Sequence, residues 1–168
     1  MARRSTTLFV CGALLLAAAP AAAGPTASVA DIKAAYLLKF GPFIEWKQDA
    51  PAPSFPICVV GENEVSKELD REAAGQKVND APVEIRHLSS GQAAAGCRIL
   101  YFAQQAADNN FPSVLTVTDT GETPRGVISF VIEHNHVRFD VNVQAASKAG
   151  LAISAKLLGL AHAVEGAP

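Results

Sequence analysis

Two positions directly after predicted strands could contact a ligand. Asp119 comes directly after the apolar stretch 114–118, and Gly61 ends the apolar stretch 55–60 and opens a helical segment. Open α/β sheets usually bind ligands at the carboxyl ends of their strands, so Gly61 and Asp119 are our candidate ligand-binding residues. A nucleotide site is less well matched, because the turn has one glycine instead of G-x-G-x-x-G and the neighbouring glutamates would repel a phosphate. Ordinary turns, with Asp119 as a turn former, are the alternative for both positions.

The sequence contains no set of residues that is typical of an enzyme. No serine lies in a nucleophile elbow, and no Cys–His–Asn arrangement is suggested. His134 and His136 form a His-x-His pair, which in an exported protein can bind zinc or copper. No third ligand is evident, and exposed polar residues at a turn explain the pair better. We therefore predict a protein with no catalytic residues, no bound metal and no cofactor.

Two cysteines, Cys58 and Cys97, remain once the N-terminal segment is removed. An even pair in an exported chain favours a disulfide, although two buried thiols are the alternative. Each cysteine lies near the start of an apolar stretch. If these stretches are neighbouring parallel strands, the sulfurs share one end of the sheet, about 5 Å apart. Closing this loop of about 40 residues would stabilise the fold by about 4 kcal/mol on the chain-entropy model.

The aromatic residues Phe40, Phe43 and Trp46 follow one another at the end of a predicted helix, just before a linker rich in alanine and proline. Exposed tryptophan and phenylalanine side chains are common anchors at protein interfaces. These three residues are therefore our candidate partner-binding residues. The alternative is that they cover the edge of a sheet as part of the core.

Strands that alternate with helices predict how these residues are positioned. Strands are expected at 55–60, 83–88, 99–103 and 114–118, and helices at 63–74 and 104–110. This alternation predicts a single α/β domain with a doubly wound, mainly parallel sheet. Alternating residues at 127–142, interrupted at His134 and Asn135, predict a C-terminal antiparallel hairpin, which makes the sheet mixed.

Helical periodicity is predicted at both ends of the domain. At the amino end, one apolar stripe is formed by Val29, Ile32, Tyr36, Phe40 and Phe43, with Lys33 and Lys39 off the stripe. At the carboxyl end, a small-residue helix is expected to follow the hairpin, with one face formed by Ala146, Gly150, Ile153, Leu157, Leu160 and Val164.

Residues 1–23 have the features of a secretory signal peptide. Arg3 and Arg4 precede an apolar stretch, and small residues up to Ala23 predict cleavage there. The mature domain, residues 24–168, would then be periplasmic and would not insert into a membrane. Losing both arginines changes the net charge from −2 to −4, and no basic cluster suggests nucleic-acid binding.

The order and spacing of five sequence segments resemble the YfiR family. The segments are KAAYLLKFGPFIEW (33–46), FPICVVG (55–61), GCRILYF (96–102), LTVTD (115–119) and RFDVNVQAASKAGLAISAKLLGLA (138–161). The resemblance covers nearly the whole mature chain. It implies the Cys58–Cys97 disulfide, whereas a second cysteine pair that some members carry is absent from this sequence.

The resemblance also implies a function. YfiR-like proteins are periplasmic repressors that bind the periplasmic domain of a membrane-bound diguanylate cyclase, which lowers cyclic di-GMP and biofilm formation. An outer-membrane lipoprotein typically captures the repressor, and members often form homodimers. An alternative from a different class is a periplasmic small-ligand sensor that works with a histidine kinase and binds its ligand near Gly61 and Asp119.

Overall fold

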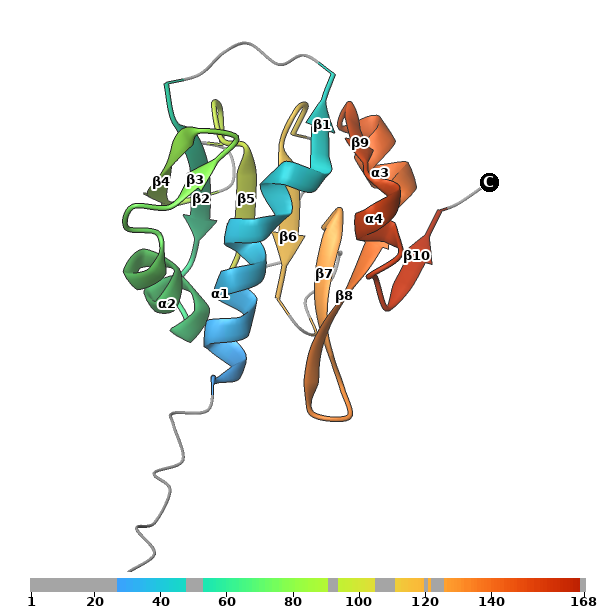
Figure 1. Ribbon diagram of the computed structural model, residues 1–168, viewed down its shortest axis with the longest axis horizontal. Helices are drawn as coiled ribbons and strands as arrows, with labels where there is room; N and C mark the ends of the chain where they lie inside the picture. Colours follow the sequence, from blue (N-terminus) through green and yellow to red (C-terminus); the bar gives the residue numbers. More distant parts are fainter. Residues whose placement is uncertain are drawn as a thin grey trace, which may run out of the picture.

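The computed structural model describes residues 27–47, 53–90, 94–104, 111–119, 121 and 126–166 (Figure 1). The helices are α1 (Val29–Phe40), the 3-10 helix η1 (Gly41–Phe43), α2 (Glu64–Glu72), α3 (Val143–Lys148) and α4 (Ala155–Leu158). The strands are β1 (Ile44–Trp46), β2 (Phe55–Val60), β3 (Lys77–Val78), β4 (Ala81–Leu88), β5 (Ile99–Phe102), β6 (Leu115–Thr118), β7 (Ile128–Glu133), β8 (His136–Asn142), β9 (Leu151–Ile153) and β10 (Ala163–Glu165). The predicted signal peptide and nearly all of the predicted helix 104–110 lie outside the described residues. Among the described residues, no helix is both long and apolar enough to cross a membrane.

Eight strands form one sheet in the order β10-β8-β7-β6-β5-β2-β4-β3, and β1 pairs with β9 in a separate small sheet. The central strands β4, β2, β5, β6 and β7 are parallel, whereas β8 pairs with β7, and β3 with β4, in antiparallel fashion. Counted along the chain, the central strands stand in the order 2-1-3-4-5, which is a doubly wound arrangement. The predicted α/β fold is therefore confirmed.

Apolar side chains form two clusters in this fold. Helices α1 and α2 lie side by side in front of the sheet in Figure 1. Under α1, Phe40 packs against Phe130 and Phe139, with ring centroids 6.1 and 5.4 Å apart respectively. These three rings belong to the larger cluster. Successive side chains of a strand point to opposite faces of a sheet, so other residues of β2 and β5 belong to a second, smaller cluster. That cluster consists of Cys58, Val60, Ala94, Cys97, Leu100, Phe102 and Val114.

The buried face of α1 differs from the predicted stripe. Val29 and Ile32 are 43% and 37% exposed, whereas Lys33 is only 5% exposed. The helix is therefore turned by about one residue, which brings Lys33, Leu37 and Phe40 towards the sheet. The physical reason is Asp119 at the end of β6, whose carboxylate pairs with Lys33. The sequence pattern of the helix alone does not reveal this distant partner.

The continuous C-terminal helix predicted from the small-residue pattern is wrong. Gly150 has a φ of +75°, a left-handed conformation that favours glycine, and it ends the first short helix, α3. The chain then forms β9, in which Leu151 pairs with Trp46 and Ile153 with Ile44. After α4, β10 joins the main sheet beside β8. Pairing with distant strands thus outweighs local helix propensity.

Candidate functional site

A polar cluster surrounds Asp119, just after β6. One carboxylate oxygen, Oδ2, accepts hydrogen bonds from Tyr101 Oη and Asn63 Nδ2, each at 2.9 Å. The other, Oδ1, pairs with Lys33 Nζ from α1. The Lys33 and Asp119 side chains are 7% and 15% exposed, so the ion pair is largely shielded from water. We call Lys33, Asn63, Tyr101 and Asp119 the Asp119 network.

Asn63 gives this network its position because it is also the N-cap of α2. Its Oδ1 accepts a hydrogen bond from the Ser66 backbone N–H at 3.0 Å. Its Nδ2 lies 3.0 Å from Tyr101 Oη and 2.9 Å from the Ala103 carbonyl oxygen. One side chain therefore joins the start of α2 to the carboxyl ends of β5 and β6.

The network lies at the topological switch point of the sheet. The strand order reverses between β2 and β5, and doubly wound sheets bind ligands in the crevice at that point. Here Asn63, which follows β2, donates through its side-chain amide to the Ala103 carbonyl, which follows β5. A Cβ on Gly61 would lie 3.6 Å from the Ala103 Cβ, so the ends of the two strands are close together. The side chains of the Asp119 network thus bond to one another across this crevice.

Gly61 and Asp119 do lie at the same edge of the sheet, as expected. Gly61 has a φ of +84°, which a turn out of β2 requires. A shallow pocket beside Asp119 is bordered by the starts of α1 and α2, and Glu64 and Glu68 line it. These acidic walls disfavour a phosphate. A ligand-binding role for Gly61 and Asp119 stays a prediction.

Sequence reasoning missed Lys33, Asn63 and Tyr101 as members of the network. Lys33 was placed off the apolar stripe of its helix, and Tyr101 lies within a continuous apolar strand. The one available signal was the Gly61-Glu62-Asn63 sequence, since an asparagine after a strand and a turn is a common N-cap. The partner that this asparagine finds across the sheet is visible only in the tertiary structure.

The aromatic residues predicted as a partner surface are mostly core. Phe40 is 1% and Trp46 is 8% exposed. The Trp46 ring packs edge-on against Phe55 at 5.7 Å, and the Arg98 guanidinium lies 5.5 Å from its centroid. Of the three candidates, Phe43 alone is half-buried. Phe40 and Trp46 are therefore buried, as the core alternative expects. A partner-binding role for the three aromatic residues is not tested by this geometry and stays a prediction.

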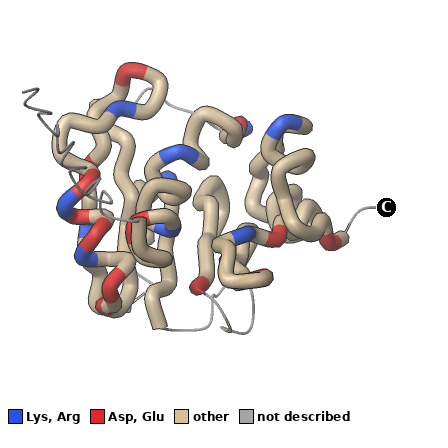
Figure 2. Tube along the Cα trace, turned by 60° about the horizontal axis from the view of Figure 1, so that its bottom comes forward, with Lys and Arg blue, Asp and Glu red and all other residues tan. Residues whose placement is uncertain are grey.

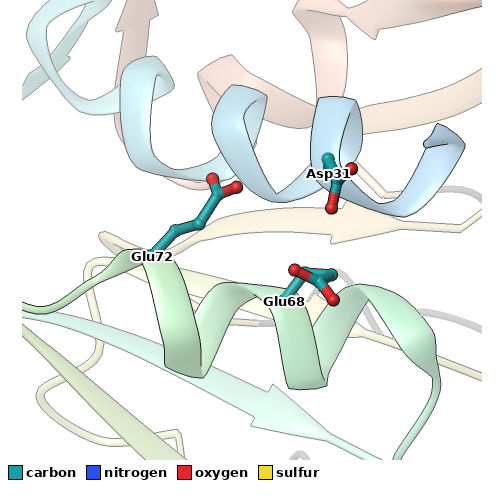
Figure 3. Close-up of side chains that lie close together, drawn as sticks. All are labelled: Asp31, Glu68 and Glu72. Atoms are coloured by element: carbon teal, nitrogen blue, oxygen red, sulfur yellow. The ribbon is translucent and has the colours of Figure 1, made fainter. Parts of the chain in front are cut away.

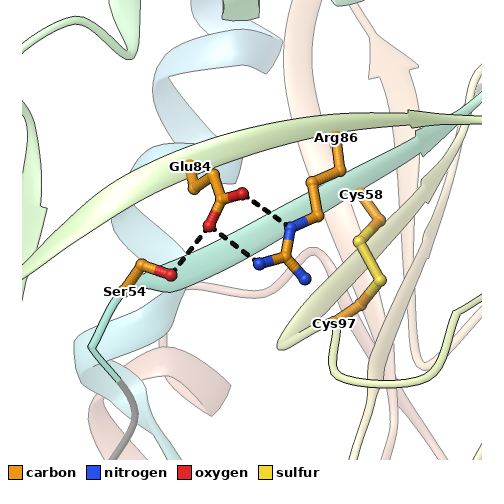
Figure 4. The surroundings of a disulfide bond; sticks show 5 residues. All are labelled: Ser54, Cys58, Glu84, Arg86 and Cys97. Atoms are coloured by element: carbon orange, nitrogen blue, oxygen red, sulfur yellow. Dashed lines mark hydrogen bonds and ion pairs between the residues drawn. A yellow bond between two sulfur atoms is a disulfide. The ribbon is translucent and has the colours of Figure 1, made fainter.

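The cysteines form the predicted disulfide between β2 and the start of β5. The Cys58 and Cys97 Cα atoms are 5.9 Å apart (Figure 4). Arg86 lies beside the disulfide and donates two hydrogen bonds to Glu84, at 2.9 and 2.8 Å. The Arg86 guanidinium, together with the Ser54 hydroxyl, lowers the pKa of Glu84 to about 2. This surface ion pair is therefore charged throughout the physiological range.

His134 lies in the predicted turn between β7 and β8, and His136 is the first residue of β8. His134 and Asn135 both have positive φ, at 46° and 63°, as a type I′ hairpin turn requires. His136 Nδ1 lies 2.8 Å from the His134 carbonyl oxygen, so one ring nitrogen is used within the turn. These contacts agree with polar residues at an exposed turn.

His162 makes the more organised histidine contact. Its Nδ1 lies 2.8 Å from Asp140 Oδ1, and its Nε2 lies 3.5 Å from Glu133 Oε1. The hydrogen bond to Asp140 raises the pKa of His162. The His162 backbone N–H also donates to the Phe139 carbonyl at 2.8 Å. His162 therefore ties the start of β10 to β8.

Three carboxylates, Asp31, Glu68 and Glu72, approach one another between α1 and α2 (Figure 3). Acidic and basic positions are interspersed along α2 (Figure 2), and Arg71 pairs with the carboxylates of the group. Its Nη2 pairs with Glu68 and lies 3.2 Å from Asp31 Oδ1. The Ser28 backbone N–H donates to Asp31 and lowers its pKa. The group is thus an ion-pair network that joins the two helices.

The whole arrangement can be compared with known proteins. The sequence matches the protein family described as YfiR/HmsC-like over residues 30–162, a range that includes the Asp119 network and both cysteines. A search of curated proteins gave no match. The family match covers most of the chain and agrees with the resemblance seen in the sequence segments. The chain therefore belongs to the YfiR/HmsC-like family, whose members are periplasmic regulators of diguanylate cyclases.

Proposed function

We propose that this protein is a repressor that binds the periplasmic sensor region of an inner-membrane diguanylate cyclase and holds the enzyme inactive. The result would be less cyclic di-GMP and less biofilm. The observation that carries the proposal is the family match over residues 30–162. Export would depend on the segment 1–23, and its cleavage near Ala23 would release the mature domain 24–168.

The contacts of the polar side chains support a binding role rather than a catalytic one. One shielded carboxylate that could serve as a base, Asp119, already accepts from Lys33, Asn63 and Tyr101. A catalytic base must instead reach a proton of the substrate. The cross-linked sheet and helices provide a rigid body, which lowers the entropic cost of binding a partner.

Repression by binding requires a difference in affinity between two states of the cyclase. To shift a cyclase from 99% active to 99% inactive, a repressor must bind the inactive conformation about 10⁴-fold more tightly. Tight binding to both conformations would change nothing. The relevant measurement is therefore the output of the cyclase in the cell, and not binding alone.

The test is deletion of the gene followed by complementation. Deletion should raise cyclic di-GMP and biofilm, and the full-length chain should reverse both effects. The matched control is residues 24–168 expressed without the N-terminal segment, which should fail because the protein stays on the wrong side of the membrane. Cross-linking of the functional chain in cells should recover a membrane diguanylate cyclase.

Two outcomes would contradict the proposal. Unchanged cyclic di-GMP after deletion would reject repression, and a simultaneous change in a kinase-controlled output would favour the ligand-sensor alternative. Complementation by the chain without its N-terminal segment would reject periplasmic action.

Two further partners belong to the same proposal on the basis of the resemblance. We propose that an outer-membrane lipoprotein captures the repressor and that the repressor acts as a homodimer. Deleting the lipoprotein gene should lower cyclic di-GMP only in cells that contain the repressor. Sedimentation of the purified mature chain should give twice the monomer mass.

A further inference from the structure

A pocket of about 400 Å³ lies between α1, η1 and β3, away from the Asp119 network. Leu38, Pro42 and Phe43 provide its apolar surface, and Lys39 and Lys77 stand at its rim. Leu38 and Phe43 are half-buried, while Pro42 and both lysines are exposed. We call this feature, defined by these five residues, the α1–β3 pocket.

The walls of the α1–β3 pocket are held in place by close packing behind it. Gly41, the first residue of η1, lies against β3 so tightly that a Cβ there would be 2.6 Å from Val78 Cγ1. The same Cβ would be 2.9 Å from the Phe55 ring. Since η1 and β3 are in direct contact, the pocket is formed before any partner arrives, which favours binding.

The charge at the rim of the pocket differs from that of the chain as a whole. In the described part of the chain, neither Lys39 nor Lys77 forms an ion pair or a side-chain hydrogen bond. A third lysine, Lys156, places its Nζ 5.6 Å from the centroid of the Phe43 ring. The acidic residue at the pocket, Glu72, lies 3.9 Å from Arg71. Lys39, Lys77 and Lys156 outnumber Glu72 at this place, so the rim of the apolar pocket is net positive in a net-negative chain.

We propose that the α1–β3 pocket is the docking surface for an acidic segment of the cyclase's periplasmic region, in which one apolar side chain is flanked by carboxylates. The apolar side chain would cover Leu38 and Phe43, and the carboxylates would pair with Lys39 and Lys77. This inference rests on the proposed function. Interfaces commonly combine an apolar centre with a polar rim, and complementary charges at the rim speed association.

The test is a charge reversal on the full mature chain, Lys39→Glu with Lys77→Glu. Both side chains are exposed, so the variant should fold. The matched control is Arg138→Glu with Lys148→Glu, which changes the net charge equally at exposed positions on β8 and α3. The probe is the purified periplasmic region of the cyclase that cross-linking recovers in cells, with affinity and association rate measured at low and high salt.

The pocket variant should bind about tenfold more weakly or worse, mainly through slower association, and its association should no longer slow as the salt concentration rises. The control should bind like the wild type. Equal weakening of variant and control, or retained binding by the pocket variant, would overturn the pocket while leaving the proposed function intact. A shift of the pocket variant from dimer to monomer with unchanged cyclase binding would also overturn it, since the occupant would be a second copy. A wild-type chain that does not bind would overturn both.

Discussion

Lys33 of α1 and Asp119 at the end of β6 form a buried ion pair that fastens the first helix to the carboxyl edge of the sheet. The two residues are separated by 86 positions in the sequence. Asn63 and Tyr101 also donate hydrogen bonds to the Asp119 carboxylate. The Asp119 side chain therefore holds α1, the start of α2 and two strands together.

Removing one member of this pair should destabilise the protein strongly. We expect Lys33→Met or Asp119→Asn alone to lower the free energy of unfolding by about 3–5 kcal/mol, because the remaining group is buried without its partner. The double variant should lose less than the sum of the two single losses. Urea unfolding of the four proteins measures this coupling, and strictly additive losses would show that the ion pair contributes nothing.

Trp46 should behave as a core residue. We expect Trp46→Ala to lower the free energy of unfolding by about 3–5 kcal/mol, since its ring fills space against Phe55. Trp46→Phe is the control. It keeps an aromatic ring, and the indole N–H has no acceptor among the described residues, so the loss should be small. Unchanged stability of Trp46→Ala together with lost partner binding would instead restore Trp46 as an interface anchor.

The disulfide should contribute to stability because it closes a long loop. Cys58 and Cys97 are 39 positions apart, and we expect the double variant Cys58→Ser with Cys97→Ser to be less stable by about 2–5 kcal/mol. A reducing agent should destabilise the wild type by a similar amount and leave the double variant unaffected. Two free thiols in the non-reduced periplasmic protein, detected by mass spectrometry, would contradict the bond.

The stability contributed by His162 should depend on pH. The hydrogen bond to Asp140 raises the pKa of His162, so its contribution should be fully present below the ordinary pKa of about 6.5. It should be lost as the pH rises through the raised pKa. We therefore expect the stability difference between wild type and His162→Gln to be larger in mildly acidic than in alkaline buffer.

Chemical unfolding over a pH series measures this difference, and amide exchange in β10 provides a local readout. His134→Asn is the control, because the His134 side chain is 88% exposed. A stability difference that is constant with pH would show that the Asp140 contact acts through packing alone.

Several features of this protein were determined by local sequence alone. The turn at His134 and Asn135 was predicted because the alternating pattern is interrupted there, and both residues have the positive φ that a tight hairpin needs. The parallel strands were predicted from short apolar stretches separated by helical segments, and the sheet follows from them. The disulfide could be predicted because the cysteines stand at equivalent ends of two such strands.

The tertiary structure decided the features that depend on distant partners. Lys33 was expected off the packed stripe of its helix, but it is buried because it pairs with Asp119, which is 86 positions away in the sequence. The small-residue segment after the hairpin fits a helix locally, yet Leu151 pairs with Trp46 and ends that pattern. Helix periodicity in a sequence shows which residues are apolar. The face that a helix buries, and the residue at which it ends, depend also on contacts with elements far apart in the sequence.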